Sequence, residues 1–186
     1  MFYRIEAPIE PTDVGLKVVN SGRILLAICE KGAIETYDPP NRPTAEEIRN
    51  LCTELKDELE TATFGDAMQR LVAALQLQYA LGDHLSGVIE GETARLLNRL
   101  AGEFVGELSD DALDDNVRFV DVFTLSMSVS TKIFNLRFRL QGESQDRSLR
   151  LAPTAVSALL AARSASRYFL FDVKAGQFVA TNELLP

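Results

Sequence analysis

The sequence of 186 residues predicts an α+β fold, with a mixed or antiparallel sheet built from strands near both ends of the chain. Three observations favour this class. Short apolar runs separated by glycine lie at 14–37, apolar residues at helical spacing fill 44–115, and alternating apolar and polar residues follow from 117 onward. Because two small β regions are each marginal alone, we expect them to share one sheet. The expected organisation is a single domain, 1–186, with a long central helical segment inserted between the strands.

The segment 14–37 predicts a three-stranded β-meander. Asn20-Ser21-Gly22 and Glu30-Lys31-Gly32 separate its short runs, and glycine supplies the positive φ that tight turns require. The run from Ile24 to Cys29 is apolar at every position, as expected for a strand covered on both faces. The prolines of DPPNRP then end this β region.

Residues 44–115 predict the helical insertion. Thr44 and Glu47 have the spacing of a capping box, in which each side chain accepts a backbone N–H of the other residue. Apolar residues then recur every three or four positions, as on the buried face of an amphipathic helix. The three stripes are Ile48, Leu51, Cys52, Leu55 and Leu59; Met68, Leu71, Val72, Leu75 and Tyr79; and Leu96, Leu97, Leu100 and Phe104.

The segment 117–186 predicts a β-hairpin, a short helix and a second β-hairpin. Apolar residues take alternate positions in its first two runs, which indicates strands with one face in the core. Residues on one face pair across a hairpin, so a turn at Ser128–Thr131 places Phe123 opposite Leu136. The remaining elements are a strand at 148–152, a helix from Pro153 and a hairpin over 168–181.

Four arginines lie on the face of this predicted sheet that is opposite its apolar rows: Arg118, Arg137, Arg139 and Arg150. In either expected register Arg150 faces Arg137 or Arg139, and like charges directly opposite destabilise a sheet. We therefore expect this face to bind an anion, either the chain's own acidic helix or the acidic surface or phosphate of a partner. The internal candidates are Glu54, Asp57 and Glu58.

The net charge of −8 is unevenly distributed. Residues 1–116 hold 10 Lys and Arg against 22 Asp and Glu, whereas residues 117–186 hold 9 against 5. The acidic part can therefore neutralise the basic part, and the overall negative charge repels nucleic acid. This balance favours internal neutralisation of the arginine face over nucleic-acid binding.

The only histidine, His84, excludes any metal site that needs two histidines. Asp83 cannot orient it on a regular helix, because neighbouring side chains there point about 100° apart. The chain contains no GxSxG nucleophile motif, GxxxxGK[ST] loop or GxGxxG motif. We interpret His84 as a structural residue and expect no catalytic residue and no cofactor.

Two sets of acidic residues keep other chemistry open. Carboxylates suit Mg²⁺ or Ca²⁺, although the cluster matches no EF-hand loop and also resembles an ordinary helix start. Asp121 falls in an apolar row across from Phe138, where it is either a buried acid or base or a sign that the row leaves the core. The cluster comprises Glu107, Asp110, Asp111, Asp114 and Asp115.

Cys29 and Cys52 fall among apolar residues and form no CxxC pair, so we expect small buried thiols. The N-terminus lacks the pattern of a signal peptide, and no apolar run approaches the roughly 18 residues that cross a bilayer. These features predict a soluble, cytoplasmic protein with no membrane partner.

The sequence favours a non-catalytic interaction protein that acts through a helical surface, as a homo-oligomer or with a protein partner. Its apolar helical stripes exceed what a small sheet can cover, which is the observation behind this hypothesis. One alternative is a nucleic-acid-binding accessory protein that uses the arginine face. The other is a metal-dependent hydrolase that uses the acidic cluster, although we expect no metal ligand there.

Overall fold

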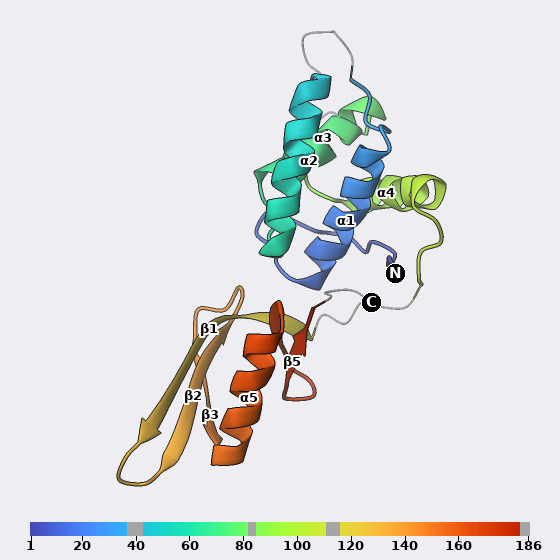
Figure 1. Ribbon diagram of the computed structural model, residues 1–186. Helices are drawn as coiled ribbons and strands as arrows, with labels where there is room; N and C mark the ends of the chain where they lie inside the picture. The colour runs from blue at the N-terminus through green and yellow to red at the C-terminus, as the bar shows by residue number, and fades with distance from the viewer. Residues whose placement is uncertain (37–42, 82–84, 111–115, 183–186) are drawn as a thin grey trace. The chain divides into compact units, whose positions relative to one another are not determined.

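The computed structural model describes residues 1–36, 43–81, 85–110 and 116–182. Contacts divide the chain into two compact units, residues 1–113 and 114–184, which we call the helical unit and the sheet unit (Figure 1). The class is α+β, as predicted, but helices and strands are segregated. Among the described residues, four helices form the helical unit, while five strands and one helix lie in the sheet unit.

The meander predicted at 14–37 is wrong, because Leu16–Glu30 forms a single helix, α1. Asn20, Ser21 and Gly22, expected at a turn, lie buried within this helix. Gly22 is needed for close packing, since a Cβ atom there would collide with the side chain of Leu59. The sheet expected from N-terminal and C-terminal strands is therefore not formed, and every named strand lies beyond residue 116.

The expected long central helical segment consists of three separate helices, α2 (Ala45–Glu60), α3 (Asp66–Gln78) and α4 (Gly91–Phe104). The capping box is confirmed: Glu47 N–H donates to Thr44 Oγ1 over 3.2 Å, and Thr44 N–H donates to Glu47 Oε2 over 2.7 Å. These hydrogen bonds from Thr44 hold the pKa of the Glu47 carboxyl below its usual value.

The three predicted apolar stripes meet α1 and one another in one core. Ile24, Leu25 and Ile28 of α1 are fully buried there, together with residues of all three later helices. These helices therefore form one unit with α1. Their main stripe residues are Leu51, Leu55, Met68, Leu71, Leu75, Leu97 and Leu100.

The first turn of α3 is capped by a residue from the end of α2. The Glu58 carboxylate accepts hydrogen bonds from Ala67 N–H over 2.7 Å and Met68 N–H over 3.0 Å. A carboxylate at this position also opposes the positive end of the helix dipole. A side chain at Gly65 would collide with this carboxylate, so glycine leaves the cap room. Glu58 is thus engaged within the helical unit.

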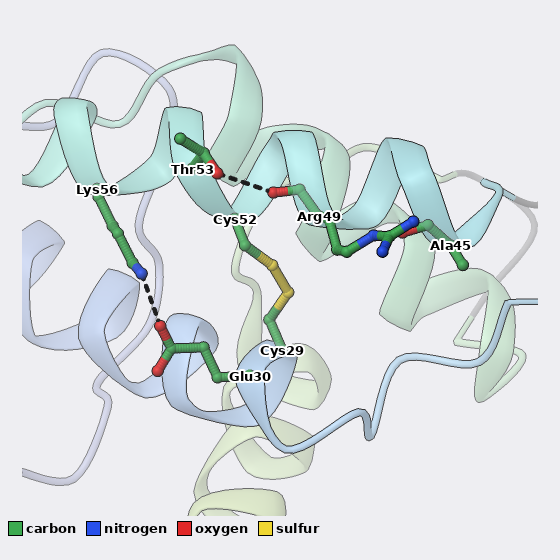
Figure 2. The surroundings of a disulfide bond; sticks show 7 residues. All are labelled: Cys29, Glu30, Ala45, Arg49, Cys52, Thr53 and Lys56. Carbon is green, nitrogen blue, oxygen red and sulfur yellow. Dashed lines mark hydrogen bonds and ion pairs between the residues drawn. A yellow bond between two sulfur atoms is a disulfide. The ribbon is translucent and has the colours of Figure 1, made fainter.

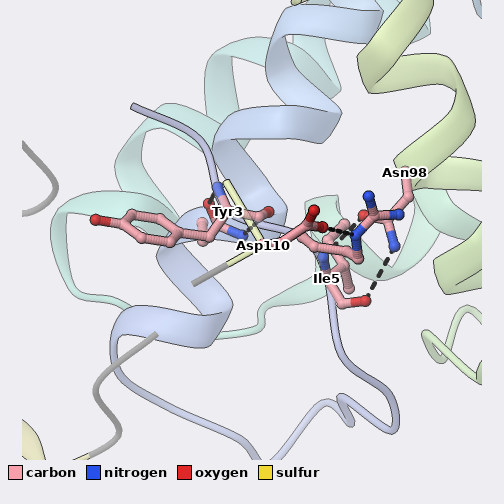
Figure 3. Close-up of polar contacts among 6 residues, drawn as sticks. Tyr3, Ile5, Asn98 and Asp110 are labelled. Carbon is pink, nitrogen blue, oxygen red and sulfur yellow. Dashed lines mark hydrogen bonds and ion pairs between the residues drawn. The ribbon is translucent and has the colours of Figure 1, made fainter. Parts of the chain in front are cut away.

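Side-chain amides hold the N-terminal segment in place. Asn98 on α4 accepts a hydrogen bond from Ile5 N–H over 2.8 Å and donates one to Ile5 O over 3.0 Å (Figure 3). Asn20 on α1 makes the same pair of bonds to Tyr3, over 2.9 and 2.8 Å. Each amide thus satisfies both backbone groups of one residue of the N-terminal segment, and Tyr3 also forms an isolated bridge with Ser109.

Cys29 on α1 and Cys52 on α2 form a disulfide (Figure 2). The expectation of two buried thiols is therefore wrong. The stripes that bury α1 against α2 also bring these two residues together. Beside the disulfide, Lys56 Nζ lies 2.8 Å from Glu30 Oε1, which adds an exposed ion pair between the same two helices.

The sheet unit confirms the predicted hairpin, helix and hairpin. Its strands are β1 (Val117–Ser128), β2 (Ile133–Leu140), β3 (Arg147–Leu151), β4 (Tyr168–Asp172) and β5 (Gln177–Thr181), with α5 (Pro153–Ala165) between β3 and β4. The order across the antiparallel sheet is β3-β2-β1-β4-β5. The core on the α5 side of the sheet centres on Leu136, Phe138, Leu140 and Phe171.

The predicted hairpin register is displaced by two residues. Phe123 pairs with Phe138, not with Leu136, and Leu125 pairs with Leu136. A shift of two residues keeps every side chain on its face, so the apolar pattern cannot detect it. A β-bulge between Val120 and Val122 adds one residue, Asp121, to β1.

Replacing Asn98 by alanine should lower the free energy of unfolding by about 2 kcal/mol, because the Ile5 backbone groups lose their partner. Urea denaturation followed by far-UV circular dichroism measures this change. Arg4→Ala is the matched control, because it removes an exposed ion pair in the same segment. The side chain of Arg4 is 56% exposed and that of its partner Asp110 is 79% exposed. The control should cost under about 1 kcal/mol, and an equal loss in both variants would contradict our account of Asn98.

Reducing the disulfide should lower the free energy of unfolding of the helical unit by about 3 kcal/mol, the loop-closure value for a sequence separation of 23. Urea denaturation with and without dithiothreitol measures it. A Cys29→Ala, Cys52→Ala variant should be equally destabilised and insensitive to the reductant. If a thiol-specific reagent detects two reactive thiols in native protein purified without reductant, the disulfide does not form.

Candidate interaction surface

The β-bulge separates the four predicted site residues into two groups. Residues that pair directly across antiparallel strands share a face of the sheet. Arg118 precedes the bulge and pairs with Phe171, a buried residue of the core. Arg118 therefore lies on the α5 side, at an exposed position. Arg137, Arg139 and Arg150 lie on the opposite face, which we call the outer face.

The expected clash between arginines of β2 and β3 does not occur. Arg150 pairs with Asn135, and Arg137 pairs with Ser148. Each arginine thus faces a small neutral residue across the strands. The predicted register was wrong by two residues, which changes the cross-strand partner of each arginine on β2 but keeps its side chain on the same face of the sheet. The argument that repulsion drives this face to bind an anion therefore fails.

Two aspartates of the sheet unit neutralise the outer face. Arg137 Nε lies 2.6 Å from Asp146 Oδ2, and Arg139 Nη1 lies 4.0 Å from Asp146 Oδ1. Arg139 Nη2 also donates to Asp121 Oδ2 over 3.3 Å. These contacts come from the loop before β3 and from the bulge, not from the acidic helix expected at Glu54, Asp57 and Glu58.

Asp121 has a structural explanation. The bulge places it outside the regular pairing, and its side chain is 54% exposed beside Arg139. Asp121 is exposed and paired, so the interpretation of it as a buried acid or base is wrong. The bulge instead moves the apolar row from one face of β1 to the other at this residue.

Arg150 differs from the other two outer arginines. Within the part of the chain that the structure describes, it makes no hydrogen bond or ion pair, and its side chain is exposed. On the α5 side, Arg147 donates to Glu143 over 2.7 and 3.0 Å. This hydrogen bonding holds the pKa of the Glu143 carboxyl below its usual value, and the nearby charge of Arg118 adds to the effect.

The predicted acidic cluster is only partly visible. His84, Asp83, Asp111, Asp114 and Asp115 lie outside the described residues. Asp110 accepts a hydrogen bond from Arg4 Nε over 2.6 Å (Figure 3). Across residues 1–36, 43–81, 85–110 and 116–182, no group of three or more His, Cys, Asp or Glu side chains could hold a metal ion.

One small cavity lies against α1 and the N-terminal segment, with Arg4, Lys17 and Ser21 among its lining residues. The Ser21 hydroxyl is buried beside it without a hydrogen-bond partner among the described residues. The cavity has room for about one water molecule, which would satisfy this hydroxyl. It is far smaller than the pockets that bind organic ligands.

Exposed large apolar side chains are concentrated on the sheet unit. Leu149 on β3 is 39% exposed and Leu160 on α5 is 44% exposed. Helix α5 is apolar around most of its circumference, yet only Val156 on it is buried. The sequence predicted a helix from Pro153 but did not indicate how little of it the sheet covers. Among the described residues of this unit, the set is Met127, Val129, Ile133, Leu149, Leu160 and Val173.

The core face of the sheet also continues outward to its β3 edge. Leu125 pairs with Leu136, which pairs with Leu149, so one apolar row crosses three strands. Leu136 is fully buried in the middle of this row, whereas Leu149 at its end is exposed. The row therefore stops at an edge where apolar surface meets water.

Among the described helices, none is long and apolar enough to cross a membrane.

Replacing Asp146 by alanine should release Arg137, while Arg139 keeps its contact with Asp121, and should strengthen binding to a heparin column. The salt dependence of binding to single-stranded DNA should steepen by about one phosphate contact. Asp57→Ala is the matched control, because it changes the net charge equally but removes an exposed acid of the helical unit. Equal elution shifts in both variants would mean that only net charge matters.

Comparisons with known proteins found no matching family model, no matching curated protein and no matching solved structure. The surface combines three properties: an outer face that is largely neutralised, an arginine at one edge that is unpaired among the described residues, and exposed apolar side chains, of which Leu149 lies at that edge.

Proposed function

We propose that this chain is a non-catalytic interaction protein that self-associates through the exposed apolar residues of its sheet unit. The observation that carries the proposal is the row Leu125, Leu136 and Leu149, which passes from full burial to exposure at the β3 edge. Burying apolar surface contributes roughly 25 cal/mol per Å². Exposed leucine, methionine and valine side chains grouped on one unit are therefore a source of association free energy.

The location of this surface differs from the original hypothesis. That hypothesis assigned association to the apolar stripes of the central helices, but these stripes are buried within the helical unit. The sheet unit, in contrast, has five short or medium strands and one helix to cover its core. A second copy would supply the missing cover. We therefore propose homo-oligomerisation through the sheet unit in place of the helices.

Nucleic-acid binding is less well supported than association. Two of the three outer arginines have aspartate partners within the sheet unit, which leaves Arg150 as the remaining free charge among the described residues of that face. A single arginine neutralises too few phosphates for substantial affinity at physiological salt. The hydrolase alternative has no supporting group of ligands among the described residues.

A cytoplasmic location fits this proposal only if Cys29 and Cys52 are reduced. Cytosolic glutathione and thioredoxin keep most thiols reduced, whereas the paired Cys29 and Cys52 would persist in an oxidising compartment. The proposed self-association does not depend on this point, since the sheet unit contains no cysteine.

Light scattering on a sizing column should give a molar mass of at least twice 20.5 kDa at micromolar protein concentration. The mass should stay constant between low and moderate salt, because apolar contacts are not screened by ions. Absorbance at 260 and 280 nm should show no bound nucleic acid. A clean monomer at every concentration would overturn the proposal, and a salt-sensitive complex with nucleic acid would favour the arginine alternative.

A further inference from the structure

We propose that two copies of this chain associate by pairing their β3 strands, antiparallel, about a two-fold axis at Leu149. This inference rests on the proposed self-association and specifies its contact. In the resulting dimer one continuous sheet passes through both copies, and the order at the junction is β2-β3-β3-β2.

Strand β3 is a free edge of the sheet. Among the described residues it pairs with β2 on one side only, and the sheet order places no described strand beyond it. An edge strand presents unpaired N–H and C=O groups that can accept another strand. The five pairs between β3 and β2 run without a bulge, and the sequence RSLRL contains no proline. Neither of these two protections of an edge is therefore present.

The apolar row determines where the axis lies. Leu149 is the exposed end of the row that begins with Leu125 and Leu136. With the axis at Leu149, this residue faces Leu149 of the second copy, and the row becomes continuous across six strands. Cross-strand leucines directly opposite are close enough for contact, with Cβ atoms about 5 Å apart. The exposed end of the core face is thereby covered.

The charges of β3 suit this register. Arg150 faces Ser148 of the second copy, and Arg147 faces Leu151, so no like charges meet directly. Arg147 is already neutralised by Glu143. Asp146 of the second copy lies one pair beyond Ser148 on the same face, within the diagonal reach of a long side chain. The free Arg150 thus obtains an acidic neighbour only in the dimer.

Two competing arrangements are less favourable. An axis at Arg150 would place two arginines directly opposite each other, which destabilises a sheet. The other free edge, β5, carries none of the exposed large apolar residues of the sheet unit. Pairing at β5 would therefore satisfy backbone groups without covering apolar surface. An axis at Ser148 remains compatible with the charges, and the first experiment separates it from Leu149.

Single cysteines introduced into β3 test the register. Leu149→Cys places two thiols on the axis, so mild oxidation should link most of the protein as a covalent dimer on a non-reducing gel. Ser148→Cys and Arg150→Cys should link at least about tenfold more slowly, because their thiols lie off the axis. Leu160→Cys is an equally exposed control on α5 and should also link slowly. Faster linkage at Ser148 than at Leu149 would overturn the register.

A charge substitution tests the contact. Leu149→Lys places like charges on the axis and should raise the dimer dissociation constant about 100-fold, measured by light scattering on dilution. Leu160→Lys introduces the same charge at a leucine of similar exposure, 44% against 39%, and should leave the dimer intact. Circular dichroism checks that both variants are folded, and the cysteine experiment is independent of that check.

The outcomes separate this inference from the proposed function. A wild-type chain that is monomeric at all concentrations contradicts both. A wild-type dimer that survives Leu149→Lys, with no linkage at Leu149→Cys, contradicts the β3 contact but leaves self-association standing. A dimer that Leu160→Lys dissociates and Leu149→Lys does not would place the contact on α5.

Discussion

One extra residue in β1 determines how charge is distributed over the sheet unit. Side chains alternate strictly between the two faces of a strand, so a bulge reverses the assignment of every residue on one side of it. The bulge at Asp121 sends Arg118 to the α5 side and leaves Arg137 and Arg139 on the outer face. It also presents Asp121 to Arg139. The neutrality of the outer face follows in part from this single irregularity.

The two units also differ in how their polar groups are satisfied. In the sheet unit, strand pairing satisfies most of the backbone. In the helical unit, Asn20 and Asn98 substitute for strands along the N-terminal segment, and Gln76 binds backbone groups of Gly87 and Val88. These hydrogen bonds hold non-helical segments against helices whose apolar faces are already buried in the core. The helical unit is thus closed around its own core, whereas the sheet unit leaves part of its core face uncovered.

Sequence patterns predicted the elements of the sheet unit and the helices from Thr44 onward, because alternation and helical spacing there continue over many residues. They failed at α1, where a buried helix contains glycine and a short apolar run that a covered strand would share. The hairpin register was missed because a shift of two residues keeps every side chain on its face. The bulge was missed because a polar residue in an apolar row can be either a buried polar group or a point where the row changes its surroundings. The predicted arginine face depended on both, so the face of Arg118 and the cross-strand neighbours of the other arginines were assigned wrongly. The closeness of Cys29 to Cys52 required knowing that α1 is a helix.

The disulfide joins α1 to α2, which are also linked by the chain between them. A break in that linking chain would therefore not separate the two helices. Cleavage of any peptide bond between Cys29 and Cys52 leaves both fragments covalently attached through sulfur. The buried contacts of Ile24, Leu25 and Ile28 with the later helices would then remain intramolecular, without the entropy loss of a second molecule. The connection is therefore a position where new chain ends or an inserted sequence can be introduced while α1 stays tethered to its core.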